Sequence, residues 1–225
     1  MISVERLHAI AHWAKGLDPA EIERACRGTT EKCYTAGSYI THRGDRLDAW
    51  MGVVSGLVKI GAITSAGKAV TLAGMPPGMW FGEGTLLKSE GRMYDISVLR
   101  DTRLALMNRA TFIWLFENSV GFNRFLVTQF NERLGQFIAL VEYGRSLDST
   151  ARIARSIAWL FNPILNPQAG TFIAITQEEL GLLAGLSRQA TNRALKTLED
   201  EKLIRLVPDG INVLNLQGLS QFENE

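Results

Sequence analysis

The segment from residue 176 to residue 206 constrains the fold of this chain more than any other. Thr176 is followed three residues later by Glu179, the spacing of a capping box, in which a hydroxyl and a carboxylate accept backbone N–H groups where a helix begins. Gly185 is suited to end that helix, because glycine readily takes the left-handed conformation. Ser187 then offers the N-cap of a second helix. The segment therefore predicts two short helices joined by a tight turn.

The side chains expected to face inward fall on one face of each helix. They are Leu180, Leu183 and Ala184 in the first helix and Thr191, Leu195 and Leu198 in the second. A hairpin is predicted next, with strands at residues 203–207 and 211–216 around the turn Pro208-Asp209-Gly210. Two such helices followed by a hairpin form a winged helix-turn-helix, whose second helix enters the major groove of DNA.

Polar side chains near the start of the second predicted helix are suited to contact DNA bases. Arg188 and Arg193 can each donate two hydrogen bonds to guanine, and Gln189 and Asn192 can bond adenine in the same way. The alternative is a solvated helix face, because any surface helix can carry two arginines. The helix-turn-helix layout favours DNA binding. The predicted DNA-contacting residues are Thr176, Ser187, Arg188, Gln189, Asn192, Arg193 and Lys196.

Residues 175–204 also resemble the DNA-binding domain of the Crp/Fnr family of transcription regulators. The shared pattern is Ser-Arg-x-x-x-x-Arg followed by Leu-Glu-x-x-x-Leu-Ile. The resemblance implies that Ser187 contacts a phosphate and that Arg188 and Arg193 contact bases, as in the catabolite-activator branch. Gln189 stands where that branch has glutamate. Because glutamate accepts from cytosine whereas glutamine prefers adenine, the middle of the half-site is expected to differ.

The length of the chain suits two modest domains, and its balance of charges does not predict a strongly basic surface. The chain has 225 residues, 46 % of them hydrophobic, with 24 Lys and Arg against 23 Asp and Glu. DNA affinity must therefore come from local placement of charge. Charges are scattered through residues 1–27, and no apolar run is long enough to span a bilayer. We expect a cytoplasmic protein without a signal peptide or a membrane partner.

Two cysteines and three histidines give little basis for a metal site. Cys26 and Cys33 fit no zinc spacing and cannot hold an iron–sulfur cluster alone. His8 and His12 lie four residues apart without a third ligand nearby, and His42 is isolated. Jelly-roll enzymes and metal sensors need a cluster of histidine and carboxylate ligands. We therefore expect no metal site, no catalytic residues and no enzyme activity.

Within residues 1–106 the sequence pattern changes from helical to β-type. One or two short helices are predicted within residues 1–30, the second opening at Asp18-Pro19. Short β-type runs separated by glycine-containing turns follow from about residue 32, a pattern typical of a β-roll or jelly roll. The predicted strands are residues 39–42, 51–54, 57–63, 69–73 and 96–99.

One turn in the predicted roll carries groups that suit an anion. Gly82 and Glu83 precede a short segment that ends at Arg92, so backbone N–H groups, a carboxylate and a guanidinium could converge. The stretch resembles the phosphate-binding cassette of cyclic-nucleotide-binding domains. This resemblance implies that Glu83 holds a ribose hydroxyl and that Arg92 pairs with the cyclic phosphate. Met93 stands where a serine or threonine is usual, and it has no donor for the phosphate.

A long helix is predicted at residues 121–143. Its apolar stripe suits a seam between two helices and consists of Leu126, Phe130, Leu134, Phe137 and Val141. The family resemblance implies that this helix is the homodimer axis and supplies two hydroxyl side chains to adenine. The matching positions here are Phe137 and Ile138, which cannot hydrogen-bond a base. They either line an apolar pocket for another ligand or close the dimer core.

The departures at Met93, Phe137 and Ile138 limit what the resemblance implies about the effector. Each lost polar contact costs about 1–3 kcal/mol, which together corresponds to several orders of magnitude in affinity. The effector and any cofactor therefore stay open. One alternative is a cyclic-AMP-dependent activator with a degraded cassette, and others are a different effector or none. A haem-dependent gas sensor of the same family is a further alternative, since one histidine and an apolar pocket suffice.

Together the patterns predict an α+β chain with three parts. These are an effector-binding-like β-roll or jelly roll with N-terminal helices at residues 1–118, a dimerisation helix at 119–144, and a winged helix-turn-helix domain at 145–225. In the last part, residues 151–161 predict a helix and residues 171–175 a short strand. The expected partners are double-stranded DNA, a second copy of the chain, and RNA polymerase.

Overall fold

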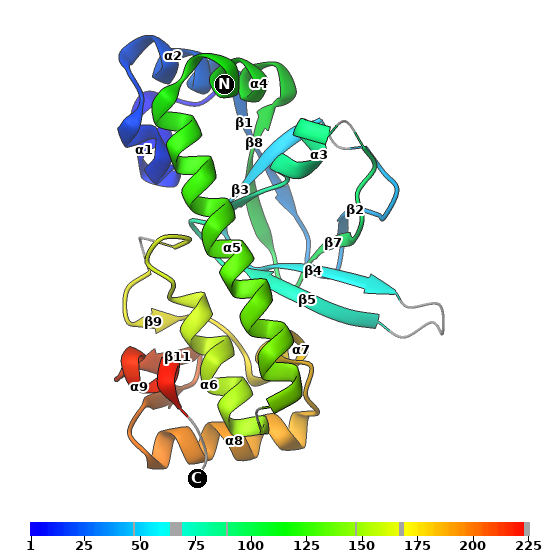
Figure 1. Cartoon of the computed structure of the whole chain (residues 1–225), viewed down its shortest axis with the longest axis vertical. Helices are drawn as coiled ribbons and strands as arrows, with labels where there is room; N and C mark the ends of the chain where they lie inside the picture. Colours follow the sequence, from blue (N-terminus) through cyan, green and yellow to red (C-terminus); the bar gives the residue numbers. More distant parts are fainter. Residues whose placement is uncertain (47, 64–68, 89, 147, 167–168, 223–225) are drawn as a thin grey trace. The chain divides into compact units, whose positions relative to one another are not determined.

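The computed structural model has the predicted α+β architecture and describes residues 1–46, 48–63, 69–88, 90–146, 148–166 and 169–222 (Figure 1). The chain forms two compact units, Met1–Phe130 and Asn131–Glu225. The boundary falls within the long helix α5 (Val120–Ser146), so the division at residues 118 and 144 stays a prediction. No helix in these described ranges is both long and apolar enough to cross a membrane.

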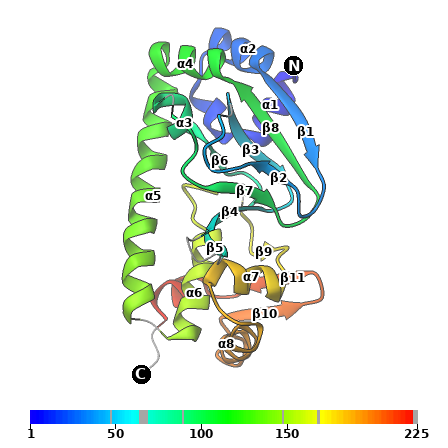
Figure 2. The same cartoon turned by 90° about the vertical axis from the view of Figure 1, so that its right-hand side faces the viewer.

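Two antiparallel sheets form the roll of the first unit (Figure 2). In spatial order, one contains β1 (Thr29–Tyr34), β8 (Thr102–Asn108), β3 (Ala49–Ser55) and β6 (Trp80–Phe81), and the other contains β2 (Tyr39–Thr41), β7 (Asp95–Val98), β4 (Val58–Ile63) and β5 (Ala69–Met75). The five predicted strands correspond to β2, β3, β4, β5 and β7. The pattern missed β1, β6 and β8. Strand β1 lies at a sheet edge and most of its side chains are exposed or half-buried, so its sequence carries no apolar alternation that would predict a strand.

Helices gather over one end of the sheet that contains β1, β8 and β3 (Figures 1 and 2). They are α1 (Val4–Ile10), the 3₁₀ helix η1 (His12–Gly16), α2 (Pro19–Gly28) and α4 (Arg109–Asn118), while α3 (Glu83–Lys88) follows β6. Asp18 caps α2 as predicted and forms a capping box with Glu21. Helix α4, capped by Asn108, was not predicted. Burial lowers the pKa of His12, whose ring packs edge-on against Phe125.

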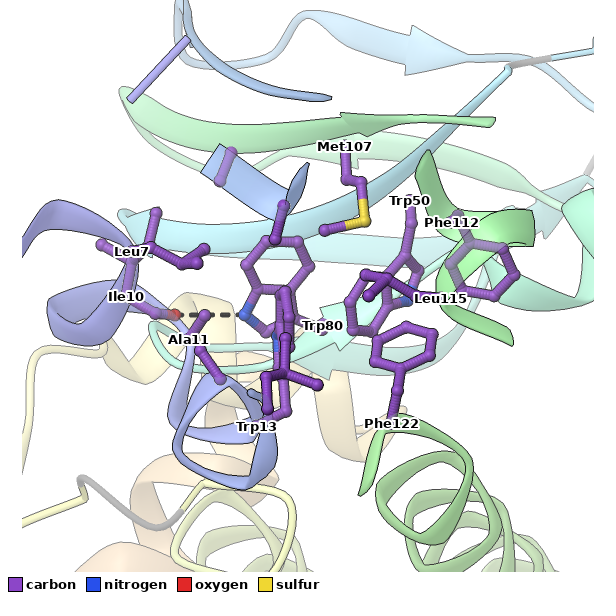
Figure 3. Close-up of a cluster of buried hydrophobic side chains, with 14 of the residues drawn as sticks. Leu7, Ile10, Ala11, Trp13, Trp50, Trp80, Met107, Phe112, Leu115 and Phe122 are labelled. Carbon is purple, nitrogen blue, oxygen red and sulfur yellow. Dashed lines mark hydrogen bonds between the residues drawn. The ribbon is translucent and has the colours of Figure 1, made fainter. Parts of the chain in front are cut away.

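Aromatic side chains form the core between these helices and the sheet (Figure 3). The ring of Trp50 lies 4.4 Å from that of Trp80 and 5.3 Å from that of Phe122 on α5, measured between centroids. Trp80 packs directly on Gly52, where an added Cβ would lie 2.4 Å from the indole. The Trp80 indole N–H donates to the backbone oxygen of Ile10 at 3.1 Å. These packed rings fix the orientation of both indoles.

Helix α5 exposes an apolar face that differs by one position from the prediction. The placement of Leu126 on the seam was wrong, because this side chain is 1 % exposed in the core of the first unit. Val127 occupies the seam position instead of Leu126. Val127, Phe130, Leu134 and Phe137 follow one another at spacings of three, four and three residues. The exposed fractions are 67 % for Val127, 38 % for Phe130, 60 % for Leu134 and 52 % for Phe137. Val141 was also predicted on this face, but its side chain lies outside the part that the structure describes.

The second unit is a three-stranded sheet packed with helices. Its elements are α6 (Ser149–Leu160), β9 (Phe172–Ile173), α7 (Gln177–Ala184), α8 (Arg188–Asp200), β10 (Ile204–Val207), β11 (Gly210–Val213) and α9 (Leu216–Gln221). The sheet order is β10-β11-β9, and both pairings are antiparallel. Helix α6 packs against α7, α8 and α9, so it forms the support on which the helix-turn-helix rests.

The helix-turn-helix agrees with the sequence prediction in detail, whereas the wing is shorter than predicted. Thr176 and Glu179 form both arms of the capping box, and Ser187 caps α8. Gly210 was predicted in the turn but pairs with Val207 as the first residue of β11. The second wing strand ends at Val213 rather than residue 216. Of the strand predicted at residues 171–175, only Phe172 and Ile173 form a strand, which is β9.

The wing strand ends early because the next residues have other hydrogen-bond partners. The N–H groups of Leu214 and Asn215 both donate to the backbone oxygen of Leu203, at 2.9 and 3.1 Å. The side chain of Asn215 then accepts from the N–H of Gly218 and caps α9. A helix start therefore replaces the last residues of the predicted strand.

Replacing Gly185 by alanine should destabilise the second unit by about 1 kcal/mol, because the residue has a φ of +66° that L-residues disfavour. Urea denaturation followed by circular dichroism would measure the shift. Gly170→Ala is the matched control, since an added Cβ there meets no atom of the described residues within 4 Å and φ is not left-handed. Equal midpoints for the two variants would contradict this interpretation of Gly185.

Candidate DNA interface and effector cassette

The outer face of α8 presents the predicted DNA-contacting side chains to solvent. Its exposed polar and basic residues are Arg188, Gln189, Asn192, Arg193 and Lys196. The opposite face is buried through Thr191, Leu195 and Leu198. Thr191 also lies against α7, where a Cβ added to Gly181 would be 2.8 Å from the threonine hydroxyl oxygen. The two helices therefore pack closely, and α8 turns its polar face outward.

Thr176 and Ser187 lie at the starts of the two helices and serve first as caps. The Thr176 hydroxyl accepts from the N–H of Glu179 at 3.1 Å, and the Ser187 hydroxyl accepts from the N–H of Ala190 at 3.3 Å. Both side chains are exposed, so their hydroxyl groups can also donate to an external acceptor. Helix N-termini favour anions, which suits a phosphate contact at either position.

Two positioning residues were not predicted from the sequence. Arg152 on α6 donates from Nη2 to the backbone oxygen of Ala184 at 2.7 Å, which fixes the end of α7. Glu199 accepts the N–H of Leu206 at 2.7 Å, which links α8 to the first wing strand. Glu199 belongs to the Leu-Glu pattern, which was the available signal. Both contacts orient the elements that would meet DNA.

Gly82 and Arg92 come together in the roll next to Glu83. Gly82 has a φ of +100°, and a Cβ built there would lie 3.1 Å from Nη2 of Arg92. The backbone of Arg92 is held on both sides, since its N–H donates to the oxygen of Asp45 at 3.0 Å and its oxygen accepts from Gly44 at 2.8 Å. The cassette thus places a guanidinium directly beside a glycine turn.

The guanidinium of Arg92 is buried without a hydrogen-bond partner among the residues that the structure describes. The residue is 3 % exposed, and all three side-chain nitrogens are shielded from solvent. Burial lowers the pKa of Arg92, while the nearby Tyr94 and Glu83 act in the opposite direction. An unpaired buried charge is unfavourable, so an anion that bonds these nitrogens would be strongly stabilised.

Glu83 begins α3 and is itself buried. Its Oε2 accepts the indole N–H of Trp50 at 3.2 Å, a contact between residues 33 positions apart that the sequence did not reveal. Met93 directly follows Arg92 in the chain, and its side chain is 68 % exposed. Phe137 and Ile138 are exposed residues of the second unit, and their predicted contact with a ligand stays a prediction.

The remaining candidate ligands do not form a cluster. Within the described ranges, no group of three or more histidine, cysteine or acidic side chains is arranged to hold a metal ion. Cys26 is buried and Cys33 is exposed, and both are free thiols. Burial raises the pKa of the Cys26 thiol, so this residue packs in the core as a neutral group.

Two family models match this chain. The model of the cyclic nucleotide-binding domain matches residues 31–119, and the model of the Crp-like helix-turn-helix domain matches residues 151–222. The first match includes the cassette of Gly82, Glu83 and Arg92. The second includes the helix-turn-helix and the wing.

Similar proteins span most of the chain. The cyclic AMP receptor protein of Thermus thermophilus is 28 % identical over 198 residues, covering 88 % of this chain and 90 % of that protein. The cAMP-activated global transcriptional regulator CRP of Haemophilus influenzae is 30 % identical over 178 residues, covering 76 % and 78 %.

Solved structures give the same result. The catabolite activator protein of Thermus thermophilus matches with a TM-score of 0.51 and 26 % identity over 92 % of this chain and 97 % of that one. FixK2 of Bradyrhizobium japonicum has a TM-score of 0.70 over 88 % and 98 %, and at 19 % identity it supports the fold alone. From its domains and relatives, this chain belongs to the Crp/Fnr family of transcription regulators.

Proposed function

We propose that this regulator acts as a homodimer on a palindromic operator and that a small anionic effector bound in the roll modulates it. The observation that carries the DNA part is the start of α8, where Arg188 and Arg193 are exposed on a helix that α6 and α7 hold rigidly. Arginines at this end of a recognition helix can each bond a guanine in the major groove. RNA polymerase is the expected further partner of such a regulator.

Selection of bound duplexes from a random library would test the operator. A homodimer should select a two-fold symmetric sequence whose half-sites are about one helical turn apart, because the symmetry of the site mirrors that of the protein. Guanines should occupy the positions that face Arg188 and Arg193, and adenine is favoured opposite Gln189. An asymmetric consensus, or no consensus, would contradict the homodimer on a palindrome.

The exposed face of α5 supports the homodimer. Val127, Phe130, Leu134 and Phe137 repeat at spacings of three and four, the pattern of a seam between two helices. A row of large apolar side chains on one helix is costly in water unless a partner covers it. The same face of a second copy has the matching pattern, because a two-fold interface uses one surface twice.

The buried guanidinium of Arg92, which no described residue hydrogen-bonds, supports an anionic effector. Relatives are named for cyclic AMP, and the CLP regulator of Xanthomonas campestris, 25 % identical, is described as responsive to c-di-GMP. Both molecules carry phosphate, which arginine bonds with two parallel N–H groups. We therefore assign the effector to phosphate-bearing small molecules, with Gly82 leaving room beside Arg92.

A buried contact in the first unit offers a route from the cassette to α5. Gln129 on α5 donates from Nε2 to the backbone oxygen of Trp80 at 3.1 Å, and Trp80 precedes Gly82 by two residues. Phe122 on the same helix packs against Trp50. A shift of the cassette on anion binding would therefore act directly on α5. Because the exposed face of α5 is the proposed dimer seam, the shift would also change how two copies pair.

Arg92→Leu should weaken the binding of cyclic AMP by about tenfold or more, because hydrogen bonds to a charged group contribute about 1.5–3 kcal/mol. Isothermal titration with millimolar cyclic AMP would measure the difference. Arg43→Leu is the control, since it removes an exposed arginine from the neighbouring turn. Equal binding by the wild type and Arg92→Leu would contradict this site. If cyclic AMP binds none of these proteins, it is not the effector.

A further inference from the structure

The cassette segment, residues 80–88, is bonded near each of its ends by a side chain of another helix. The segment consists of β6, the glycine turn and α3. Gln129 on α5 donates from Nε2 to the backbone oxygen of Trp80 at 3.1 Å. Arg109, the first residue of α4, donates from Nη1 to the backbone oxygen of Leu86 at 2.7 Å. Because both acceptors are backbone atoms, both bonds act on the path of the chain itself.

At the first end, Gln129 bonds a carbonyl that points away from the sheet. Strand β6 is the last strand of its sheet, next to β3. The oxygen of Met79 accepts from the N–H of Val53 on β3 at 2.9 Å. Successive carbonyls of a strand point to opposite sides, so the oxygen of Trp80 points away from β3. Gln129 is 4 % exposed, and removing its buried amide would take a donor from this oxygen without giving it water in return.

At the other end, Arg109 bonds a carbonyl in the last turn of α3. This helix spans Glu83–Lys88, so the oxygen of Leu86 has no partner four residues later within the helix. Arginine suits this place, because its side chain can bond the last carbonyls and its charge matches the negative end of the helix. The backbone of Arg109 is also fixed, since its N–H donates to the oxygen of Asp48 at 3.0 Å. Helix α3 packs against α4, from which Arg109 comes (Figure 2).

We propose that Gln129 and Arg109 are positioning residues that fix the two ends of the cassette segment and thereby set how tightly Arg92 binds a phosphate-type anion. The inference rests on the proposed effector site. Between the two bonds lies Gly82, whose Cβ position is 3.1 Å from Nη2 of Arg92. If either end is released, the glycine turn can move relative to the guanidinium. An anion must then order the segment as it binds, which lowers its affinity.

The first test uses the full-length protein without any ligand. Gln129→Met and Arg109→Met each remove one donor and keep an unbranched side chain. The carbonyl ¹³C signal of Trp80 should shift in the first variant and that of Leu86 in the second. Arg109 makes contacts beyond this bond, so the effect is measured at Leu86 itself. Arg109→Lys keeps a donor and should restore part of the Leu86 signal. An unchanged carbonyl signal in either methionine variant would overturn the inference.

Leu126→Met and Arg24→Met are the matched controls. Leu126 lies three residues before Gln129 on the buried face of α5 and is 1 % exposed. Arg24 on α2 lies beside α4, with its guanidinium carbon 4.5 Å from the ring centroid of Trp114. Both substitutions disturb packing around the same helices but leave the two carbonyl bonds in place. The two carbonyl signals should therefore keep their wild-type positions. Equal shifts in a control and in its paired variant would show that packing alone is responsible and would overturn the inference.

The second test titrates the same proteins with inorganic phosphate and follows the side-chain ¹⁵N signal of Arg92. Each methionine variant should bind phosphate about three- to tenfold more weakly than the wild type, the range expected for one hydrogen bond. Arg109→Lys should recover part of that loss. In the double variant of Gln129→Met and Arg109→Met, the loss should be smaller than the product of the single losses, because both donors act on one segment.

Wild-type affinity in either single variant, or a full product of losses in the double variant, would overturn the inference. Failure of the wild type to bind phosphate would instead contradict the proposed effector site. The ligand-free carbonyl signals would still decide whether Gln129 and Arg109 hold the cassette segment.

Discussion

Replacing Arg188 or Arg193 by alanine is expected to weaken binding to the selected operator by about 1–3 kcal/mol for each half-site, with loss of preference at one base position. Both side chains are exposed on the capped start of α8, while the buried face of the helix is unaffected by either change. The fold should therefore persist, and the loss should be confined to base contacts. Fluorescence anisotropy with the operator and with single-position variants of it would measure both effects.

Arg27→Ala is the control for overall charge in this experiment. Arg27 is exposed on α2 and pairs with Glu23 at 3.1 Å, so the variant changes the net charge equally without touching α8. It should bind the operator as the wild type does, apart from a small electrostatic effect. If Arg188→Ala or Arg193→Ala weakens binding equally on every sequence, that residue contacts phosphate rather than a base.

Leu134→Glu should convert the homodimer to a monomer at micromolar concentration. Leu134 is 60 % exposed at the middle of the apolar face of α5, and two copies would place two carboxylates in one seam. Burying an unpaired charge costs several kcal/mol, so the dissociation constant of the dimer should rise about a hundredfold or more. Sedimentation velocity over a concentration series would measure the shift, and operator binding should weaken in parallel.

Thr128→Glu provides the matched control for that variant. Thr128 is exposed on α5 next to Val127 but lies outside the repeat of the apolar face, and its hydroxyl donates to the backbone oxygen of Arg124. The added charge would stay in water, so the dimer should persist. Dissociation by both variants, or by neither, would contradict the assignment of the interface.

The helix-turn-helix could be predicted from sequence because its signals are local. The capping box of Thr176 and Glu179 and the glycine turn at Gly185 each depend on contacts within four residues. The wing was less predictable, since the end of β11 depends on the carbonyl of Leu203, about ten residues away. The position of the seam was also ambiguous, because Leu126 and Val127 are both apolar and only the folded core shows which one is buried.

The cassette was only partly predictable. Gly82, Glu83 and Arg92 are close in sequence, and the structure brings all three together. One partner of Glu83 is Trp50, which comes from a strand more than thirty residues earlier, and no spacing rule connects them. Long-range partners of this kind follow from packing rather than from local pattern.

Fluorescence anisotropy of the full-length protein on a labelled palindromic duplex, with and without cyclic AMP at one fixed salt concentration, tests the central claim most directly. We predict that the protein binds the palindrome about a thousandfold or more tightly than a scrambled duplex of equal length, as specific regulators do. A further gain with cyclic AMP would identify the nucleotide as an effector. Equal affinity for the palindrome and the scrambled duplex in both conditions would contradict the claim that α8 recognises a specific operator.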